Sequence, residues 1–120
     1  MSVSIIGGSV SPSTAFTLNA QTGTTYTFVL TDANNTLVTA SNASAQTYTI
    51  PPNSSVAYPV GSQINIIQIG AGQVTFAQGS GVTIASNGAT ATAPKLRVQY
   101  SSASAIKVAT DTWYVVGDIS

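Results

Sequence analysis

The sequence contains no cysteine, no histidine and no glutamate, and these absences exclude several kinds of site. Without cysteine there is no disulfide, no thiolate nucleophile and no zinc–sulfur centre. Without histidine, a serine nucleophile would need a lysine base or an unusual arrangement of aspartates. No two acidic residues share a motif that would suit a glycosidase. We therefore expect no catalytic residue, no cofactor and no metal site, and we predict that the chain is not an enzyme.

Charged residues are scarce, at 5% of the sequence, against about a quarter in typical globular domains. The basic residues are Lys95, Arg97 and Lys107, and the acidic residues are Asp32, Asp111 and Asp118. So few cations exclude the basic surface that nucleic-acid binding needs and an electrostatic contact with a membrane. A net charge of zero favours association. We therefore expect a subunit of a dense protein assembly, with neither nucleic acid nor membrane as a partner.

Most of the sequence alternates apolar and polar residues with a period of two, which is typical of strands with one buried face. The segments with this pattern are Thr24–Leu30, Thr47–Ile50, Val74–Phe76, Val82–Ile84, Leu96–Tyr100 and Ile106–Val108. Ile64–Ile69 and Trp113–Val116 are apolar on both faces, which predicts central strands or strands covered by a neighbouring subunit. No segment has the periodicity of an amphipathic helix over three turns.

Segments rich in glycine and asparagine separate the predicted strands. Asp32–Asn35, Gly70–Gly72, Gln78–Gly81 and Ser86–Gly88 are predicted to form tight hairpins that need positive φ angles. Short strands joined by hairpins predict an all-β class, and a compact antiparallel β-sandwich, a jelly roll and a barrel-like module fit the pattern equally well.

Residues 1–22 differ in texture from the rest, so we predict two parts: an N-terminal attachment arm, 1–22, and a single β domain, 23–120. The arm carries scattered apolar residues among serine, threonine and glycine, namely Val3, Ile5, Ile6, Val10 and Phe16. One interpretation is an edge strand preceded by a leader. The other, which we favour slightly, is an extended arm whose apolar residues dock on a partner.

Three other features have alternative explanations. Asp32 with Asn34 and Asn35 could contact calcium, but one carboxylate is too few for a tight site, and a capped turn explains the group better. Trp113 lies in an apolar strand, which favours a place in the core. Tyr58 lies in a proline-rich loop, where an exposed tyrosine could contact a ligand or belong to an interface.

From Gly23 onwards the sequence resembles a module that recurs in virion proteins of tailed bacteriophages. The matching stretches are Thr24–Leu30, Tyr48–Ser55, Tyr58–Ile64, Ile67–Phe76, Gly79–Ile84 and Asp111–Asp118. The resemblance implies one of two settings. One is the distal end of a long tail or fibre protein, sometimes after collagen-like repeats, which implies a trimer. The other is a small free-standing protein that decorates the capsid.

The resemblance and the arm together predict a capsid decoration, or cement, protein on the outer surface of the capsid. Three copies would pack through Ile67, Ile69 and Phe76, while the arm contacts the major capsid protein and so stabilises the assembled head. The alternative is a receptor-binding module at the tip of a tail or head fibre. In that case loops containing Tyr58 would recognise a glycan of the host surface.

Overall fold

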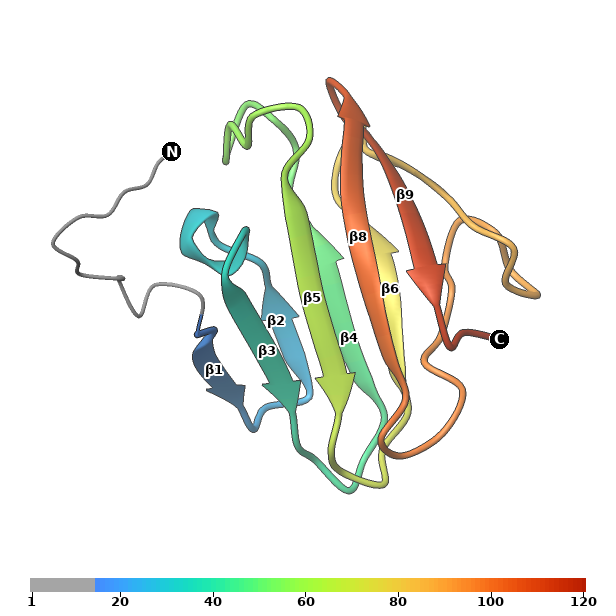
Figure 1. The fold of residues 1–120 in the computed structure, drawn as a ribbon. Coiled ribbons are helices and arrows are strands. Elements are labelled where there is room, and N and C mark those ends of the chain that lie inside the picture. Colours follow the sequence, from blue (N-terminus) through green and yellow to red (C-terminus); the bar gives the residue numbers. More distant parts are fainter. Residues whose placement is uncertain (1–14) are drawn as a thin grey trace, which may run out of the picture.

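The computed structural model describes residues 15–120, which form nine strands in two sheets (Figure 1). The strands are β1 (Thr17–Gln21), β2 (Thr25–Thr27), β3 (Thr36–Ala40), β4 (Gln46–Ile50), β5 (Gln63–Gln68), β6 (Val74–Gln78), β7 (Thr83–Ala85), β8 (Ser102–Ala109) and β9 (Thr112–Gly117). A 3-10 turn, Leu30–Asp32, follows β2. One sheet has the order β1-β3-β5-β8-β9-β7, and the other has the order β2-β4-β6. The predicted all-β class is confirmed.

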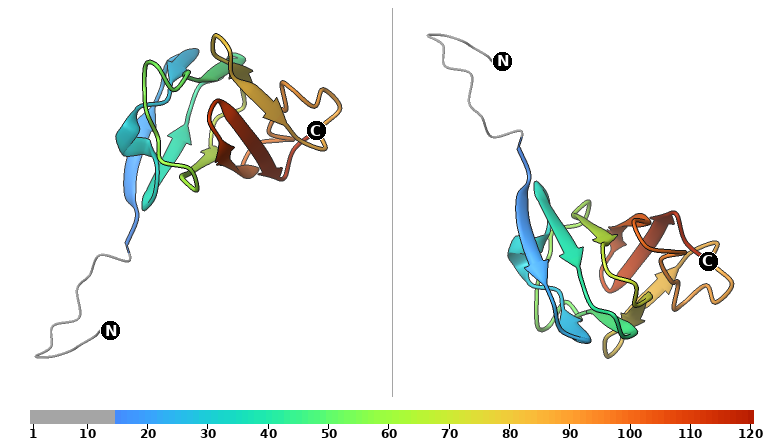
Figure 2. Two further views of the ribbon diagram at one scale, coloured as in Figure 1. Left: turned by 90° about the horizontal axis from the view of Figure 1, so that it is seen from above. Right: turned by 90° about the horizontal axis from the view of Figure 1, so that it is seen from below.

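The first six strands alternate between the two sheets, so the chain winds in coils. Each strand pairs in parallel with the strand two positions later, from β1 with β3 to β4 with β6. The three-stranded sheet lies behind the larger sheet in Figure 1. After the coils, β8 and β9 add an antiparallel hairpin to the large sheet, and β7 pairs in parallel with β9. Figure 2 shows β1 and the C-terminus on opposite sides of the molecule.

The predicted antiparallel pairing is therefore wrong for most of the molecule. Five of the strand pairs are parallel, and only β5 with β8 and β8 with β9 are antiparallel. Glycine and asparagine indicate a turn, but they do not indicate whether the next strand returns in the same sheet or crosses to the other one. The prediction of hairpins assumed a return in the same sheet. Gly70–Gly72 makes such a crossing, from β5 to β6.

Corners of successive coils stack closely on one another. The amide of Gly72 donates to the carbonyl of Asn42 at 2.8 Å, and the Asn42 side chain donates to the carbonyl of Thr22 at 2.8 Å. A Cβ atom at Gly72 would lie 1.8 Å from the carbonyl oxygen of Ser44. This contact therefore requires glycine at position 72. The positive φ that was predicted for this turn is absent there, whereas Asn34, Asn35 and Gly81 in other predicted turns have positive φ.

Several predicted strands differ from the observed ones. The predicted strand Thr24–Leu30 ends at Thr27, before the 3-10 turn, and Leu96–Tyr100 forms a single bridge at Leu96 and then turns, with φ of 71° at Tyr100. β3 was not predicted. The prediction of a central strand at Ile64–Ile69 is confirmed, because β5 lies between β3 and β8. β9 also lies inside the sheet, between β8 and β7.

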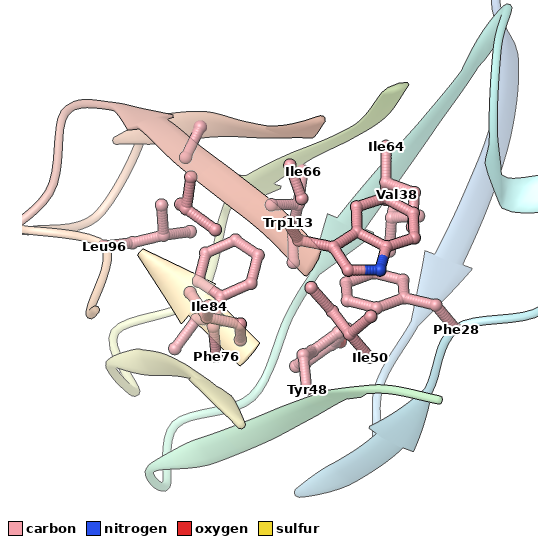
Figure 3. Packing of buried hydrophobic residues seen from close by; sticks show 14 of the residues in the cluster. Phe28, Val38, Tyr48, Ile50, Ile64, Ile66, Phe76, Ile84, Leu96 and Trp113 are labelled. Atoms are coloured by element: carbon pink, nitrogen blue, oxygen red, sulfur yellow. The ribbon is translucent and has the colours of Figure 1, made fainter. Parts of the chain in front are cut away.

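The core fills the space between the sheets with aromatic and branched side chains, as Figure 3 shows. Phe28 packs against Tyr48 with ring centroids 5.7 Å apart and against Phe76 at 6.4 Å. Trp113 is buried, as predicted, and meets the edge of the Tyr58 ring at 5.2 Å. One continuous cluster therefore holds both sheets and the C-terminal hairpin together.

β1 changes the predicted boundary between arm and domain. All five of its residues pair with β3, from Thr17 opposite Thr36 to Gln21 opposite Ala40. The prediction of an arm over residues 1–22 is therefore wrong from Thr17 onwards, and the edge-strand interpretation holds for this segment. The pairing was missed because β3 itself was not predicted.

Asp32 caps the turn after β2, as the simpler interpretation of this segment predicted. Its carboxylate is buried and accepts hydrogen bonds from the Asn19 side chain at 2.7 Å, the Tyr26 hydroxyl at 2.6 Å and the Val29 amide at 2.9 Å. These donors use the lone pairs that a calcium ion would need. The buried carboxylate therefore stabilises the turn at the first coil.

The corner contact predicts a difference between two glycines at equivalent turns. We expect Gly72→Ala to lower the free energy of unfolding by about 3 kcal/mol, at the upper end for overpacking, because the new Cβ meets backbone that cannot yield. Gly23→Ala is the matched control, since its Cβ would lie 3.5 Å from the nearest backbone atom, and should change stability by less than about 0.5 kcal/mol. Denaturant unfolding measures both values, and equal losses would contradict the stacking.

The buried phenols predict a steep alkaline transition. Burial, followed by the hydrogen bond to Asp32, raises the pKa of Tyr26 to about 12, and burial raises the pKa of Tyr48 to about 12. A phenol whose pKa is higher in the folded state stabilises the fold below pH 10, and this contribution is lost as the pH rises from 10 to 12. Tyrosinate absorbance and circular dichroism, followed together, should show these two phenols ionising only as the protein unfolds. Their ionisation near pH 10 in a fully folded protein would contradict this.

Candidate interaction surface

The predicted contact residues fall in different parts of the chain. Val3, Ile5, Ile6 and Val10 lie outside the described residues. Phe16 lies directly before β1, and its side chain is exposed. Of the predicted arm residues, the structure therefore describes only Phe16, which is exposed next to the edge strand β1 of the large sheet.

The three residues predicted at a trimer interface do not share a face. Ile67 points outward from β5, since Ile66 and Gln68 on either side of it are buried. Phe76 lies on the other sheet, points inward and is 0% exposed. The assignment of Phe76 to an interface is therefore wrong, because its ring fills the core against Phe28. Ile67 and Ile69 are half-buried.

Tyr58 is also buried, at 2% exposure, so the prediction of an exposed ligand contact is wrong. Its hydroxyl donates to the carbonyl of Val29 at 2.6 Å, and burial raises its pKa above the ordinary value for tyrosine. The proline-rich loop folds back onto the sheet and carries this side chain inward. A proline-rich composition indicates a loop, but not whether its side chains contact the core.

Exposed apolar side chains of the large sheet lie at both of its ends, with Leu18 on β1 and a larger group on the outer face at β7, β8 and β9. We call Ala85, Ile106, Tyr114 and Val116 the β8–β9 patch. Tyr114 pairs with Ile106 on one side and Ala85 on the other. Tyr114 is 50% exposed and Val116 is 51% exposed. The patch is thus a continuous apolar surface across three strands.

An open groove adjoins the patch. It is lined by Ala85, Ser86, Asn87, Tyr114 and Gly117, among others. The tyrosine ring forms an apolar wall, and the residues after β7 supply hydroxyl and amide groups. This combination can hold a side chain of another protein or the ring of a sugar.

The rest of this outer face is uncharged, and its polar side chains lie among the apolar Leu18, Leu37 and Ile67. In its centre the Gln63 side chain donates to Asn65 at 2.8 Å, and the Ser104 hydroxyl donates to Asn65 at 2.7 Å. Lys107 is the one charged residue within the strands of this sheet, and it is buried. The described part of the face therefore offers no charged side chain to keep another protein at a distance.

The outer face of the small sheet has a different character. Thr25, Thr47 and Thr75 lie side by side across β2, β4 and β6, and Thr27 pairs with Thr49 in the next row. Hydroxyl groups in these rows can be hydrated, whereas the β8–β9 patch has none besides the Tyr114 phenol. Of the two outer faces, that of the large sheet is the more apolar.

An ion pair lies just beyond the end of β9, two residues after Val116. Arg97 and Asp118 form an exposed ion pair at 2.7 Å, and hydrogen bonds from Arg97 and Ser101 lower the pKa of the Asp118 carboxyl. Among residues 15–120 the side chains of His, Cys, Asp and Glu form no group of three that could hold a metal ion. The same part of the chain contains no helix that is long and apolar enough to cross a membrane.

The sequence contained a signal for the patch. Trp113–Val116 is apolar on both faces, and β9 places Trp113 and Val115 inward and Tyr114 and Val116 outward. The strand was recognised, but the interface was assigned to Ile67, Ile69 and Phe76. An interior strand with an apolar outer face was the more specific signal.

No model of a known protein family matches this chain, and comparisons with characterised proteins and with solved structures found no significant similarity.

Proposed function

We propose that the chain is a structural virion protein of a tailed bacteriophage that decorates the outside of the capsid. Copies associate through the β8–β9 patch and bridge neighbouring subunits of the major capsid protein. The sequence resemblance implies that the associated form is a trimer. The two sheets face each other as in a β-sandwich, and the outer face of the large sheet is available for contacts. The observation that carries the proposal is the outer face of the large sheet, which is uncharged and exposes Tyr114 and Val116.

The energy for such an assembly would come from apolar burial. Covering apolar surface contributes about 25 cal/mol per Å², from which the costs of association are subtracted. Since the patch contains no charged group, its affinity should depend little on salt concentration. A protein that binds only the assembled shell stabilises that shell by mass action.

The groove beside Tyr114 favours a second candidate, a receptor-binding module at the tip of a tail or fibre. An aromatic ring next to the polar side chains of Ser86 and Asn87 suits a host-surface glycan. Tyr114 takes the part that was predicted for Tyr58. Saturable binding of the isolated protein to host cells, lost in Tyr114→Ala, would favour this candidate over decoration.

The patch predicts that one added charge will prevent association. We expect Tyr114→Lys to convert the oligomer to a monomer, because a lysine ammonium buried in an apolar contact loses its hydration. Thr47→Lys is the matched control, since it adds the same charge to the exposed outer face of the small sheet. Light scattering after size exclusion gives the mass of each. If Tyr114→Lys keeps the native oligomer, the interface lies elsewhere.

The predicted arm can now be tested without damage to the fold. A chain that starts at Ala15 keeps β1 and its pairing with β3. We expect this truncated protein to keep its folded structure and oligomeric state, and to lose at least about tenfold in affinity for purified capsids, which corresponds to about 1.4 kcal/mol. Sedimentation with expanded capsids measures the binding. Unchanged affinity would remove the arm from the capsid contact.

A further inference from the structure

Lys107 is buried although its side-chain partners are all neutral. It lies in β8, is 3% exposed and donates from Nζ to Oδ1 of Asn53 at 2.6 Å and to the carbonyl of Tyr58 at 2.7 Å. The one ion pair among residues 15–120 joins Arg97 and Asp118, so no carboxylate lies within ion-pair distance of this amine. A lysine is rarely buried in this way unless it is paired.

The strand neighbour of Lys107 is a buried aromatic residue. Lys107 pairs across the hairpin with Trp113, which is buried, and the Trp113 ring meets the Tyr58 ring edge-on at 5.2 Å. Lysine amines that are removed from water and from carboxylates are the ones that proteins use as nucleophiles.

Asn53 is held in place from a third part of the chain. Its backbone amide donates to Oδ1 of Asp111 at 2.7 Å. Asp111 lies in the turn between β8 and β9, with φ of 55°. The amine of Lys107 thus contacts the side chain of Asn53, while the carboxylate of Asp111 holds the backbone of the same residue. Such positioning is the main requirement of a reaction within one molecule.

We propose that Lys107 and Asn53 become joined by an intramolecular isopeptide bond. The lysine ammonium first gives one proton to water, and the resulting amine attacks Cγ of Asn53. The Nζ–Cγ bond forms, the Cγ–Nδ2 bond breaks, and ammonia leaves. One amine proton moves to the departing nitrogen. We assign this transfer to the carboxylate of Asp111, which accepts a hydrogen bond from the backbone amide of Asn53. No oxidant and no further reactant is needed.

The bond would fix the proline-rich loop to the large sheet. It joins residues 54 positions apart. Like a disulfide, it closes a long loop and so lowers the conformational entropy of the unfolded chain. The sequence contains no cysteine, and this reaction supplies a covalent link without one. The proposal is independent of the phage assignment, since it concerns residues inside a single chain.

Intact-mass spectrometry of the purified full-length protein tests the proposal directly. We expect a mass lower than the sequence mass by about 17 Da, the mass of ammonia. Trypsin should fail to cleave after Lys107, and the peptide that contains Asn53 should remain attached to the peptide that contains Lys107. A folded protein that keeps its full sequence mass after prolonged incubation, with normal cleavage after Lys107, would overturn the proposal.

Three variants separate this reaction from other losses of ammonia. Lys107→Met removes the amine and should restore the full mass, whereas a succinimide at Asn87, which precedes Gly88, would still show the loss. Lys95→Met is the matched control, because Lys95 is exposed, and should keep the shift.

Asp111→Asn tolerates the same backbone angle and should slow the mass change at least about tenfold in a folded protein. An unchanged rate in this variant would exclude Asp111 as the proton carrier.

Discussion

The close stacking of successive corners is the constraint on which the rest of this structure depends. The chain can cross between the sheets and return in register only if the corner of one coil rests on the backbone of the corner before it. At Gly72 the carbonyl oxygen of Ser44 lies so close that there is no space for a side chain. Parallel strands need a crossover connection, and here the crossover is a strand of the other sheet. The second sheet thus takes the place of the helices that usually cover parallel sheets.

The winding also decides which faces are free. Because coils stack in register, residues of the same kind form rows, and the threonines of the small sheet lie beside one another. The C-terminal hairpin interrupts this order, since it runs antiparallel to β5 and brings the Tyr114 side of β9 to the outer surface. The part of the chain that was added after the coils ended therefore carries one of the apolar areas of the outer face. An interaction surface at this place leaves the stacked corners undisturbed.

The sequence predicted the all-β class and the strands around β4, β5, β6 and β9 from the period of two, because burial of one face is a local property of a strand. It did not predict the winding, since sheet membership depends on contacts between distant residues such as Thr17 and Thr36. The burial of Tyr58 and Phe76 was missed for a related reason. A tyrosine in a loop and a phenylalanine in a strand have no local mark that distinguishes a core position from an interface.

The network at Lys107 was missed in the same way, because its members come from three segments that are far apart in the sequence. A methionine at position 107 would fill similar space without the loss of hydration that an amine suffers there. The hydrogen bonds to Asn53 and Tyr58 offset part of that loss, but a buried amine with neutral partners stabilises a fold less than a well-packed apolar side chain. The chain has few charged residues and buries Lys107, one of them, among neutral partners. The reactivity of an amine held against an amide group explains this position better than packing does.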